Sequence, residues 1–101
     1  MFDNQNERYM TRGIAKTVHP EIALLLWHVI DRLKDKGMEI DYLQVFELSI
    51  LIDEQIITHR QEKPPYKEQL IVKWRKTKPI TNTIWCNDNG ECQIMLLPEE
   101  Y

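Results

Sequence analysis

The sequence is poor in the residues from which the commonest active sites are built. It has one serine, Ser49, inside an apolar stretch, and only three glycines, scattered at positions 13, 37 and 90. A hydrolase nucleophile needs glycines beside its serine, and a phosphate-binding loop needs several glycines close together. The HExxH motif of zinc proteases is also missing. These absences argue against a serine hydrolase, a Walker or Rossmann nucleotide site and a zinc protease.

Cysteine is scarce as well. Cys86 and Cys92 form no CxxC pair, and no neighbouring residues complete a four-ligand zinc set, so we expect neither a metal nor another cofactor. A two-residue turn between them would place Cys86 opposite Gln93, whereas a three-residue loop would place it opposite Cys92 and allow a disulfide. Free thiols are the usual state in an intracellular protein, and we expect them here.

Long apolar runs and an excess of basic charge are absent too. The longest apolar run, residues 22–27, is far shorter than the roughly 18 residues of a membrane-spanning helix. The first residues lack the pattern of a signal sequence. Thirteen basic and 16 acidic residues give a net charge of −3, which argues against a general nucleic-acid-binding surface. We therefore expect a cytoplasmic protein that does not enter a membrane.

The residues that are present predict one domain, residues 1–101, with 43% hydrophobic and 29% charged residues. The clearest element is a helix from Pro20 to Lys36. Proline suits the first helical position, apolar residues then recur with the spacing of one buried face, and Gly37 is a natural stop. Residues 1–7 are polar and are expected to be frayed, and residues 8–12 suit a short strand.

The second half of the chain has the pattern of strands. Phe46, Leu48, Ile50 and Ile52 alternate like a strand with one buried face, although a helix competes for this stretch. Residues 55–61 and 66–74 follow as two strands, separated by a proline pair, and residues 87–90 (NDNG) suit a hairpin turn. The predicted fold is α+β: an antiparallel meander of about five to six strands with one main helix packed on one face.

One polar stretch, residues 56–68, concentrates candidate functional side chains. On a strand, His59 and Arg60 point to opposite faces, so they do not act together on one surface. We therefore expect no catalytic residue here. The interpretation that we favour is a stiff polar hairpin tip that binds a partner through His59, Arg60, Glu62 and Tyr66.

Two further clusters are charged. Residues 73–78 (KWRKTK) carry four cations around Trp74, and Lys73, Arg75 and Lys76 are candidates for contacting a partner or the phosphates of RNA. The indole shares its face with two apolar residues, which favours a position in the core. The acidic tail adds Glu99 and Glu100 as candidates for contacting a basic partner.

Four segments carry a resemblance to a known family: RYMTRGI, DYLQVFELS, HRQEKPPY and MLLPEEY. Together they resemble an uncharacterised family of small proteins of Firmicutes and of their phages and plasmids. The resemblance spans nearly the whole chain and implies no catalytic residue. The sequence is also similar to type II anti-CRISPR proteins, which inhibit the RNA-guided DNA nuclease of the host.

These resemblances imply a non-enzymatic protein of a mobile element, acting in the cytoplasm of a bacterial host cell. Its expected partner is a host defence protein, the type II CRISPR nuclease, and its expected effect is interference with guide RNA assembly. The alternative from another class is an RNA-binding protein or a small metal-independent nuclease that uses His59 and the basic residues 73–78. RNA binding is not favoured, because the net charge is negative.

Overall fold

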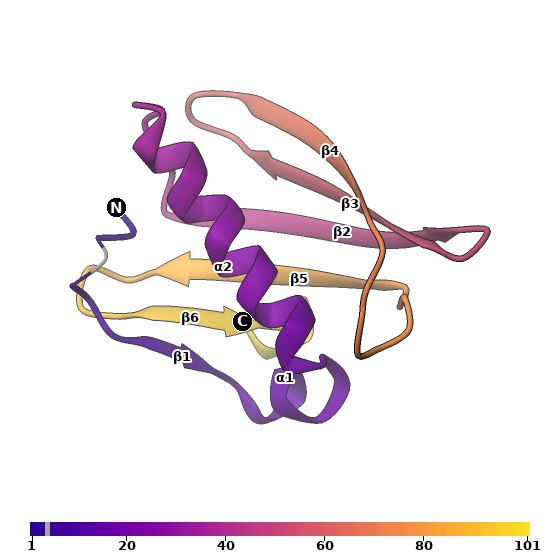
Figure 1. The fold of residues 1–101 in the computed structure, drawn as a ribbon. Coiled ribbons are helices and arrows are strands. Elements are labelled where there is room, and N and C mark those ends of the chain that lie inside the picture. Colours follow the sequence, from indigo (N-terminus) through magenta and orange to yellow (C-terminus); the bar gives the residue numbers. More distant parts are fainter. Residues whose placement is uncertain (4) are drawn as a thin grey trace.

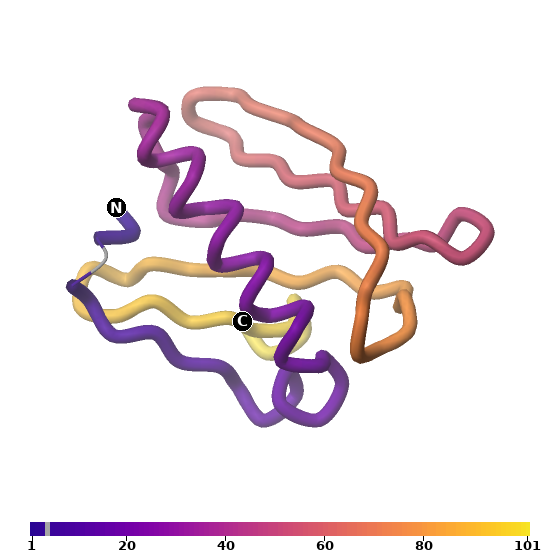
Figure 2. Tube along the Cα trace, viewed as in Figure 1, coloured from indigo at the N-terminus to yellow at the C-terminus, as the bar shows by residue number. Residues whose placement is uncertain are grey.

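A computed structural model describes residues 1–3 and 5–101 (Figures 1 and 2). Within these described residues the chain forms six strands, two α-helices and one short 3-10 helix. In order they are β1 (Arg8–Met10), α1 (Arg12–Thr17), α2 (Pro20–Asp35), β2 (Leu43–Leu51), β3 (Glu54–Gln61), β4 (Tyr66–Val72), β5 (Asn82–Asp88), β6 (Gln93–Leu96) and η1 (Pro98–Glu100).

The strands form one sheet in the order β1-β6-β5-β2-β3-β4. All neighbouring pairs are antiparallel except β1 and β6, which are parallel. The main helix, α2, lies across one face of this sheet (Figure 1). The predicted fold class, α+β with one main helix on one face of the sheet, is confirmed, but the sheet is mixed and does not have the strand order of a meander. The sequence pattern does not indicate the strand order. After β4 the chain returns across the sheet, and β5 pairs with β2.

Helix α2 begins at the residue that the sequence predicts and ends within one residue of the predicted end. The His19 ring accepts a hydrogen bond from the Glu21 backbone at 3.0 Å, and Pro20 occupies the first helical position, where its missing N–H costs nothing. Regular helix ends at Asp35, one residue before the predicted end, and Gly37 follows with a φ of +87°. A glycine adopts this left-handed conformation without steric strain.

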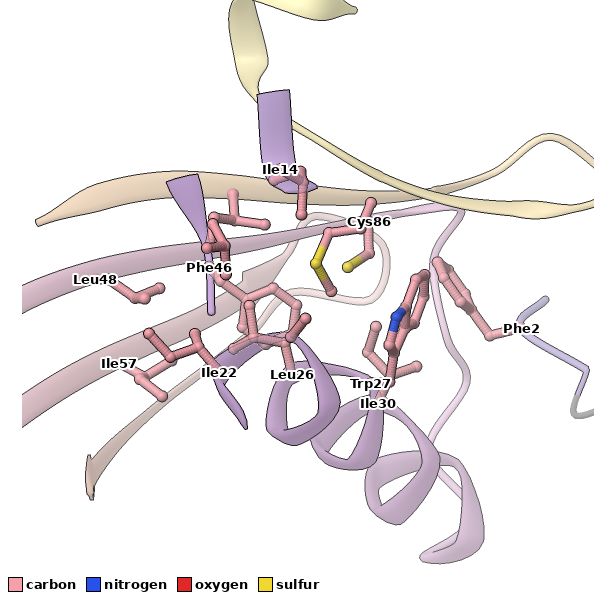
Figure 3. Close-up of a cluster of buried hydrophobic side chains, with 14 of the residues drawn as sticks. Phe2, Ile14, Ile22, Leu26, Trp27, Ile30, Phe46, Leu48, Ile57 and Cys86 are labelled. Carbon is pink, nitrogen blue, oxygen red and sulfur yellow. The ribbon is translucent and has the colours of Figure 1, made fainter. Parts of the chain in front are cut away.

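The hydrophobic core lies between α2 and the sheet (Figure 3). Ile22, Leu26 and Ile30 of the helix are fully buried, and they pack in one cluster with Phe46 and Ile57 of the sheet. Burying a side chain of this size contributes roughly 1.5–3 kcal/mol. None of the helices in the described part of the chain is long and apolar enough to span a membrane.

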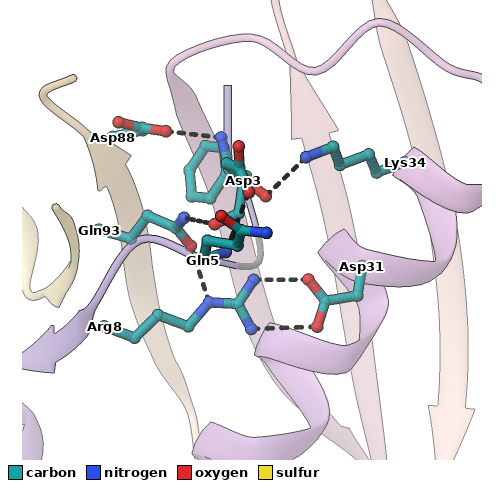
Figure 4. A network of polar contacts seen from close by, with 8 residues as sticks. Asp3, Gln5, Arg8, Asp31, Lys34, Asp88 and Gln93 are labelled. Atoms are coloured by element: carbon teal, nitrogen blue, oxygen red, sulfur yellow. Dashed lines mark hydrogen bonds and ion pairs between the residues drawn. The ribbon is translucent and has the colours of Figure 1, made fainter. Parts of the chain in front are cut away.

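The prediction that residues 1–7 are frayed is wrong for Phe2. Its side chain is fully buried in the core, and its backbone N–H donates to Asp88 Oδ2 at 2.5 Å (Figure 4). Lys34 Nζ donates to the Phe2 carbonyl at 3.1 Å, and Gln93 Nε2 donates to the Asp3 carbonyl at 2.7 Å. The single aromatic residue therefore anchors this polar segment. Asn4 lies outside the described residues.

The two predictions for the turn between the cysteines are both wrong. Cys86 pairs with Met95, and the loop between β5 and β6 comprises four residues, 89–92. Asn89 Oδ1 accepts hydrogen bonds from the backbones of Glu91 and Cys92, which stabilises this longer loop. The thiols therefore do not face each other, and the expectation of two free cysteines is confirmed.

Candidate functional site

His59 is enclosed in the core rather than displayed. Its side chain is fully buried, its ring stacks on Phe46 with centroids 4.5 Å apart, and its Nε2 lies 2.6 Å from Gln44 Oε1. Burial lowers the pKa of the imidazole to about 4, against a smaller opposing effect of the Glu68 carboxylate. We therefore withdraw His59 from the predicted partner-binding residues, because a partner cannot reach it.

A network of buried glutamines, which the sequence analysis missed, surrounds this histidine. Gln44 Nε2 donates to Gln61 Oε1 at 2.8 Å, and Gln61 Nε2 donates to the carbonyls of Glu39 and Pro64 at 3.0 and 2.9 Å. A buried amide must be hydrogen-bonded to offset its desolvation. These bonds hold the β3–β4 turn in place. One feature of the sequence indicated this network: strand alternation puts Gln61 on the same face as His59.

The polar hairpin tip does not present its residues on one surface. Arg60 Nε forms a 3.2 Å ion pair with Glu47 on the face of the sheet that α2 does not cover. Glu62 is exposed in the β3–β4 turn. Tyr66 packs against the core, and its hydroxyl donates to Glu68 at 2.5 Å, which raises the pKa of the phenol to about 12.

The basic residues 73–78 lie beyond the other end of β4 from this turn. Lys73, Arg75 and Lys76 are exposed, whereas Trp74 packs against the core and donates its Nε1–H to Gln55 at 3.1 Å. The expectation that Trp74 faces the core is confirmed. The backbone N–H groups of Arg75 and Lys76 donate to the Glu21 carboxylate at 2.9 and 2.8 Å, which anchors the segment and lowers the pKa of that carboxyl.

The two glutamates of the tail have different surroundings. Glu99 is exposed to solvent. Glu100 accepts hydrogen bonds from Thr11 Oγ1 at 2.6 Å and from the backbone N–H groups of Leu97 and Gly13 at 2.8 and 3.2 Å. The Thr11 hydrogen bond is the main cause that lowers the pKa of the Glu100 carboxyl. Glu100 therefore fastens the end of the chain to the start of α1.

The β2–β3 hairpin ends in an apolar tip, although the sequence predicts a buried face for Ile50 and Ile52. Ile50, Leu51 and Ile52, which we call the apolar tip, are 45%, 62% and 87% exposed. The prediction that Ile50 and Ile52 continue the buried face is therefore wrong, because the hairpin extends past the helix that covers the rest of β2 (Figure 1). Ile52 also has a φ of +58°, which β-branched residues rarely adopt.

The described residues offer no metal centre. Within residues 1–3 and 5–101, no group of three or more His, Cys, Asp or Glu side chains is arranged to hold a metal ion. The predicted site residues thus lie in several separate places: the core, the β3–β4 turn, the basic segment and the tail. The structure brings Lys73, Arg75 and Lys76 together, but it does not join them to Glu62 or Glu99.

Comparison with known proteins gives a family and a fold. Residues 7–100 match the family model described as "Staphylococcal protein of unknown function (DUF960)". The fold is similar to a crystal structure of a protein of unknown function from Enterococcus faecalis, with a TM-score of 0.86 and 23% sequence identity over 99% of this chain and 94% of that one. No curated protein matches the chain.

Proposed function

The chain belongs to the DUF960 family of staphylococcal proteins of unknown function, and we propose that it is a non-enzymatic protein that binds a partner protein through the apolar tip. The family description gives no activity, so the proposal is based on the surface of the protein. The main support is the exposure of three consecutive large apolar residues, Ile50, Leu51 and Ile52. Single exposed apolar residues are common on protein surfaces, but a contiguous group on a projecting hairpin is typical of an interaction site.

The conformation of Ile52 adds a second line of support. Ile52 and Asp53 form a two-residue loop, since Leu51 pairs with Glu54. Tight hairpins normally place glycine or asparagine where φ is positive. A β-branched residue there costs about 1–2 kcal/mol in the folded protein. An exposed isoleucine therefore destabilises the free protein, and contact with a partner would offset that cost.

The arrangement of polar groups favours binding over catalysis. The one buried histidine is enclosed by Phe46 and Gln44, and the exposed charged candidates lie in separate places. A general base has to reach the proton that it abstracts. For the RNA-binding alternative, the exposed cations Lys73, Arg75 and Lys76 remain suitable, but Trp74 is held by Gln55 and the core and is not free to stack on a base.

The partner that we propose is the type II RNA-guided nuclease of the bacterial host, whose inhibition would follow from interference with guide RNA assembly. The resemblance to type II anti-CRISPR proteins motivates this choice. The net charge of −3 is compatible with contact to the positively charged channel that holds the guide in such nucleases. The apolar tip would supply the desolvated centre of the interface, which is where binding energy concentrates.

A pull-down tests both the partner and the surface. The protein is immobilised and offered the nuclease with and without guide RNA, beside a tip variant, Leu51→Ser/Ile52→Gly, and a control, Ile71→Ser. Ile71 is 63% exposed and lies on β4, which β3 separates from the β2 strand of the tip. We expect the wild type and the control to retain the guide-free nuclease and the tip variant to lose it.

The two possible failures of this experiment have different meanings. If neither form of the nuclease is retained by the wild type, the proposed partner is wrong. If the tip variant retains it as well as the control does, the apolar tip is not the interface. Incubation with guide RNA alone addresses the alternative, because cleavage or a gel shift would favour a nuclease or an RNA-binding protein.

A further inference from the structure

A groove runs between helix α2 and the edge strand β4. Two adjacent hollows form it: Leu24, Leu25, Val72 and Trp74 contribute to one, and Arg32, Lys36, Glu68 and Leu70 contribute to the other. The helical residues recur every three or four positions, so they belong to one face of α2. The residues of β4 alternate, so they belong to one face of the strand. The two hollows therefore follow each other along one helix and one strand.

Strand β4 is also an open edge. It pairs with β3 over seven residue pairs without a bulge, from Gln61↔Tyr66 to Gln55↔Val72. No strand in residues 1–3 or 5–101 pairs with its other side, and β4 is the outermost strand of the sheet in Figures 1 and 2. The backbone N–H and C=O groups along such an edge are free to pair with another extended chain.

We propose that an extended segment of a partner protein adds to β4 as a seventh, antiparallel strand and inserts its alternate side chains into the groove beside α2. Main-chain hydrogen bonds to the edge would supply affinity, and the two hollows would select side chains. A groove between an edge strand and a helix offers free main-chain groups and hollows for side chains in one place. This proposal concerns a surface other than the apolar tip and does not depend on the identity of the partner proposed above.

The lining determines the chemistry of the segment. At the end near Val72, the exposed Leu24 and the partly buried Leu25 and Trp74 offer an apolar wall. At the other end, Arg32 and Lys36 are exposed cations.

The two anions of the groove are already engaged. Glu21 accepts from the backbone of Arg75 and Lys76, and Glu68 accepts from the Tyr66 hydroxyl. Both carboxylates keep their charge, but four cationic side chains line the same two hollows, so the net charge of the groove is positive although the whole protein carries −3. This local charge favours an acidic segment over a basic one.

The direction of β4 then determines the order of the side chains along the partner segment. Strand β4 runs from Glu68 towards Val72, so an antiparallel segment would meet the apolar hollow first and the cationic hollow second. We expect apolar side chains at alternate positions of its N-terminal half and acidic side chains at alternate positions of its C-terminal half.

The test uses a synthetic, fluorescein-labelled peptide, Val-Ser-Val-Ser-Glu-Ser-Glu, with the intact protein. Two matched peptides serve as controls: one with lysine in place of glutamate, and one with N-methyl groups on alternate backbone nitrogens, which cannot donate to the edge strand. Affinities are measured by fluorescence anisotropy. The binding site is mapped by the chemical shifts and hydrogen exchange of the protein amides.

We expect the acidic peptide to bind at least about tenfold more tightly than the lysine peptide, and the N-methylated peptide not to bind. The variants Leu24→Asp and Arg32→Glu should each weaken binding by about tenfold, and both change exposed positions of the helix. Ile71→Asp, on the opposite face of β4, should leave the affinity unchanged. The amides of β4 should become protected from exchange.

Three outcomes would overturn the proposal. One is equal binding of the plain and N-methylated peptides, or no binding of either. Another is a loss of affinity in Ile71→Asp as large as in Leu24→Asp. The third is a dimer in sedimentation that Leu24→Asp dissociates, because the groove would then be occupied by a second copy of this chain.

Discussion

Replacing Ile52 by glycine should stabilise this protein, although the change removes a large apolar side chain. Ile52 is 87% exposed, so its removal sacrifices little buried surface. Its φ of +58° is unfavourable for a β-branched residue and easy for glycine. The side chain at this position therefore costs stability in the free protein instead of adding to it.

The expected magnitude follows from two opposing terms. Relief of the left-handed conformation contributes about 1–2 kcal/mol. Glycine also makes the unfolded chain more flexible, which costs about 0.4–1 kcal/mol. The midpoints of these two ranges leave a net gain in the free energy of unfolding of about 0.8 kcal/mol. For a domain of this size, that gain raises the melting temperature by roughly 3–6 °C.

Thermal and urea unfolding, followed by circular dichroism, measure this gain. The matched control is Leu51→Gly, one residue earlier, where the backbone is an ordinary strand and the side chain is 62% exposed. Glycine within a strand should destabilise the protein by roughly 0.5–1 kcal/mol. The two neighbouring changes should thus have opposite signs. A melting temperature that falls in both variants would refute the reasoning about Ile52.

Three further predictions concern titration and thiol reactivity. Burial lowers the pKa of His59 from 6.5 to about 4, so the unfolded chain takes up a proton that the folded protein excludes. As the pH falls from 6.5 to 4, the free energy of unfolding should therefore decrease by about 1.4 kcal/mol per pH unit. Urea unfolding of His59→Gln should lack that slope. The pKa of Glu100 is lowered, so its stabilisation is present above its ordinary value of 4.5 and is lost as the pH falls through the folded pKa. Glu100→Gln should melt lower at neutral pH and depend less on acid, and identical acid profiles would contradict this. Burial raises the pKa of the Cys86 thiol, so a thiol reagent should label only Cys92 in the native protein, and Cys92→Ser should remain unlabelled until it unfolds.

The local elements were predictable because short-range patterns specify them. Helix α2 has a proline at its start, one apolar face and a glycine after its end, and each of these acts within a few residues. The opposite faces of His59 and Arg60 follow from the alternation of a strand in the same way. The length of the β5–β6 loop was not predictable, because a side chain of the loop itself, Asn89, favours four residues over two or three.

The candidate site was less predictable than the fold. Alternation shows which residues share a face of a strand, but it does not show whether another element covers that face. Ile50 lies on the same face of β2 as the buried Phe46, and it is exposed because α2 does not reach the end of the hairpin, whereas Ile52 lies in the loop beyond the strand. His59 looked like a reactive group in its polar stretch, and the residues that enclose it come mainly from another strand.

The sequence by itself therefore determined the α+β class, the position of the main helix, the strand alternation and the absence of common catalytic motifs. Each of these depends on residues that are neighbours along the chain. The tertiary structure decided the order of the strands, the burial of Phe2 and His59, the exposure of the apolar tip and the groove between α2 and β4. Each of these depends on which distant segment covers a surface, since burial is a property of contacts in space.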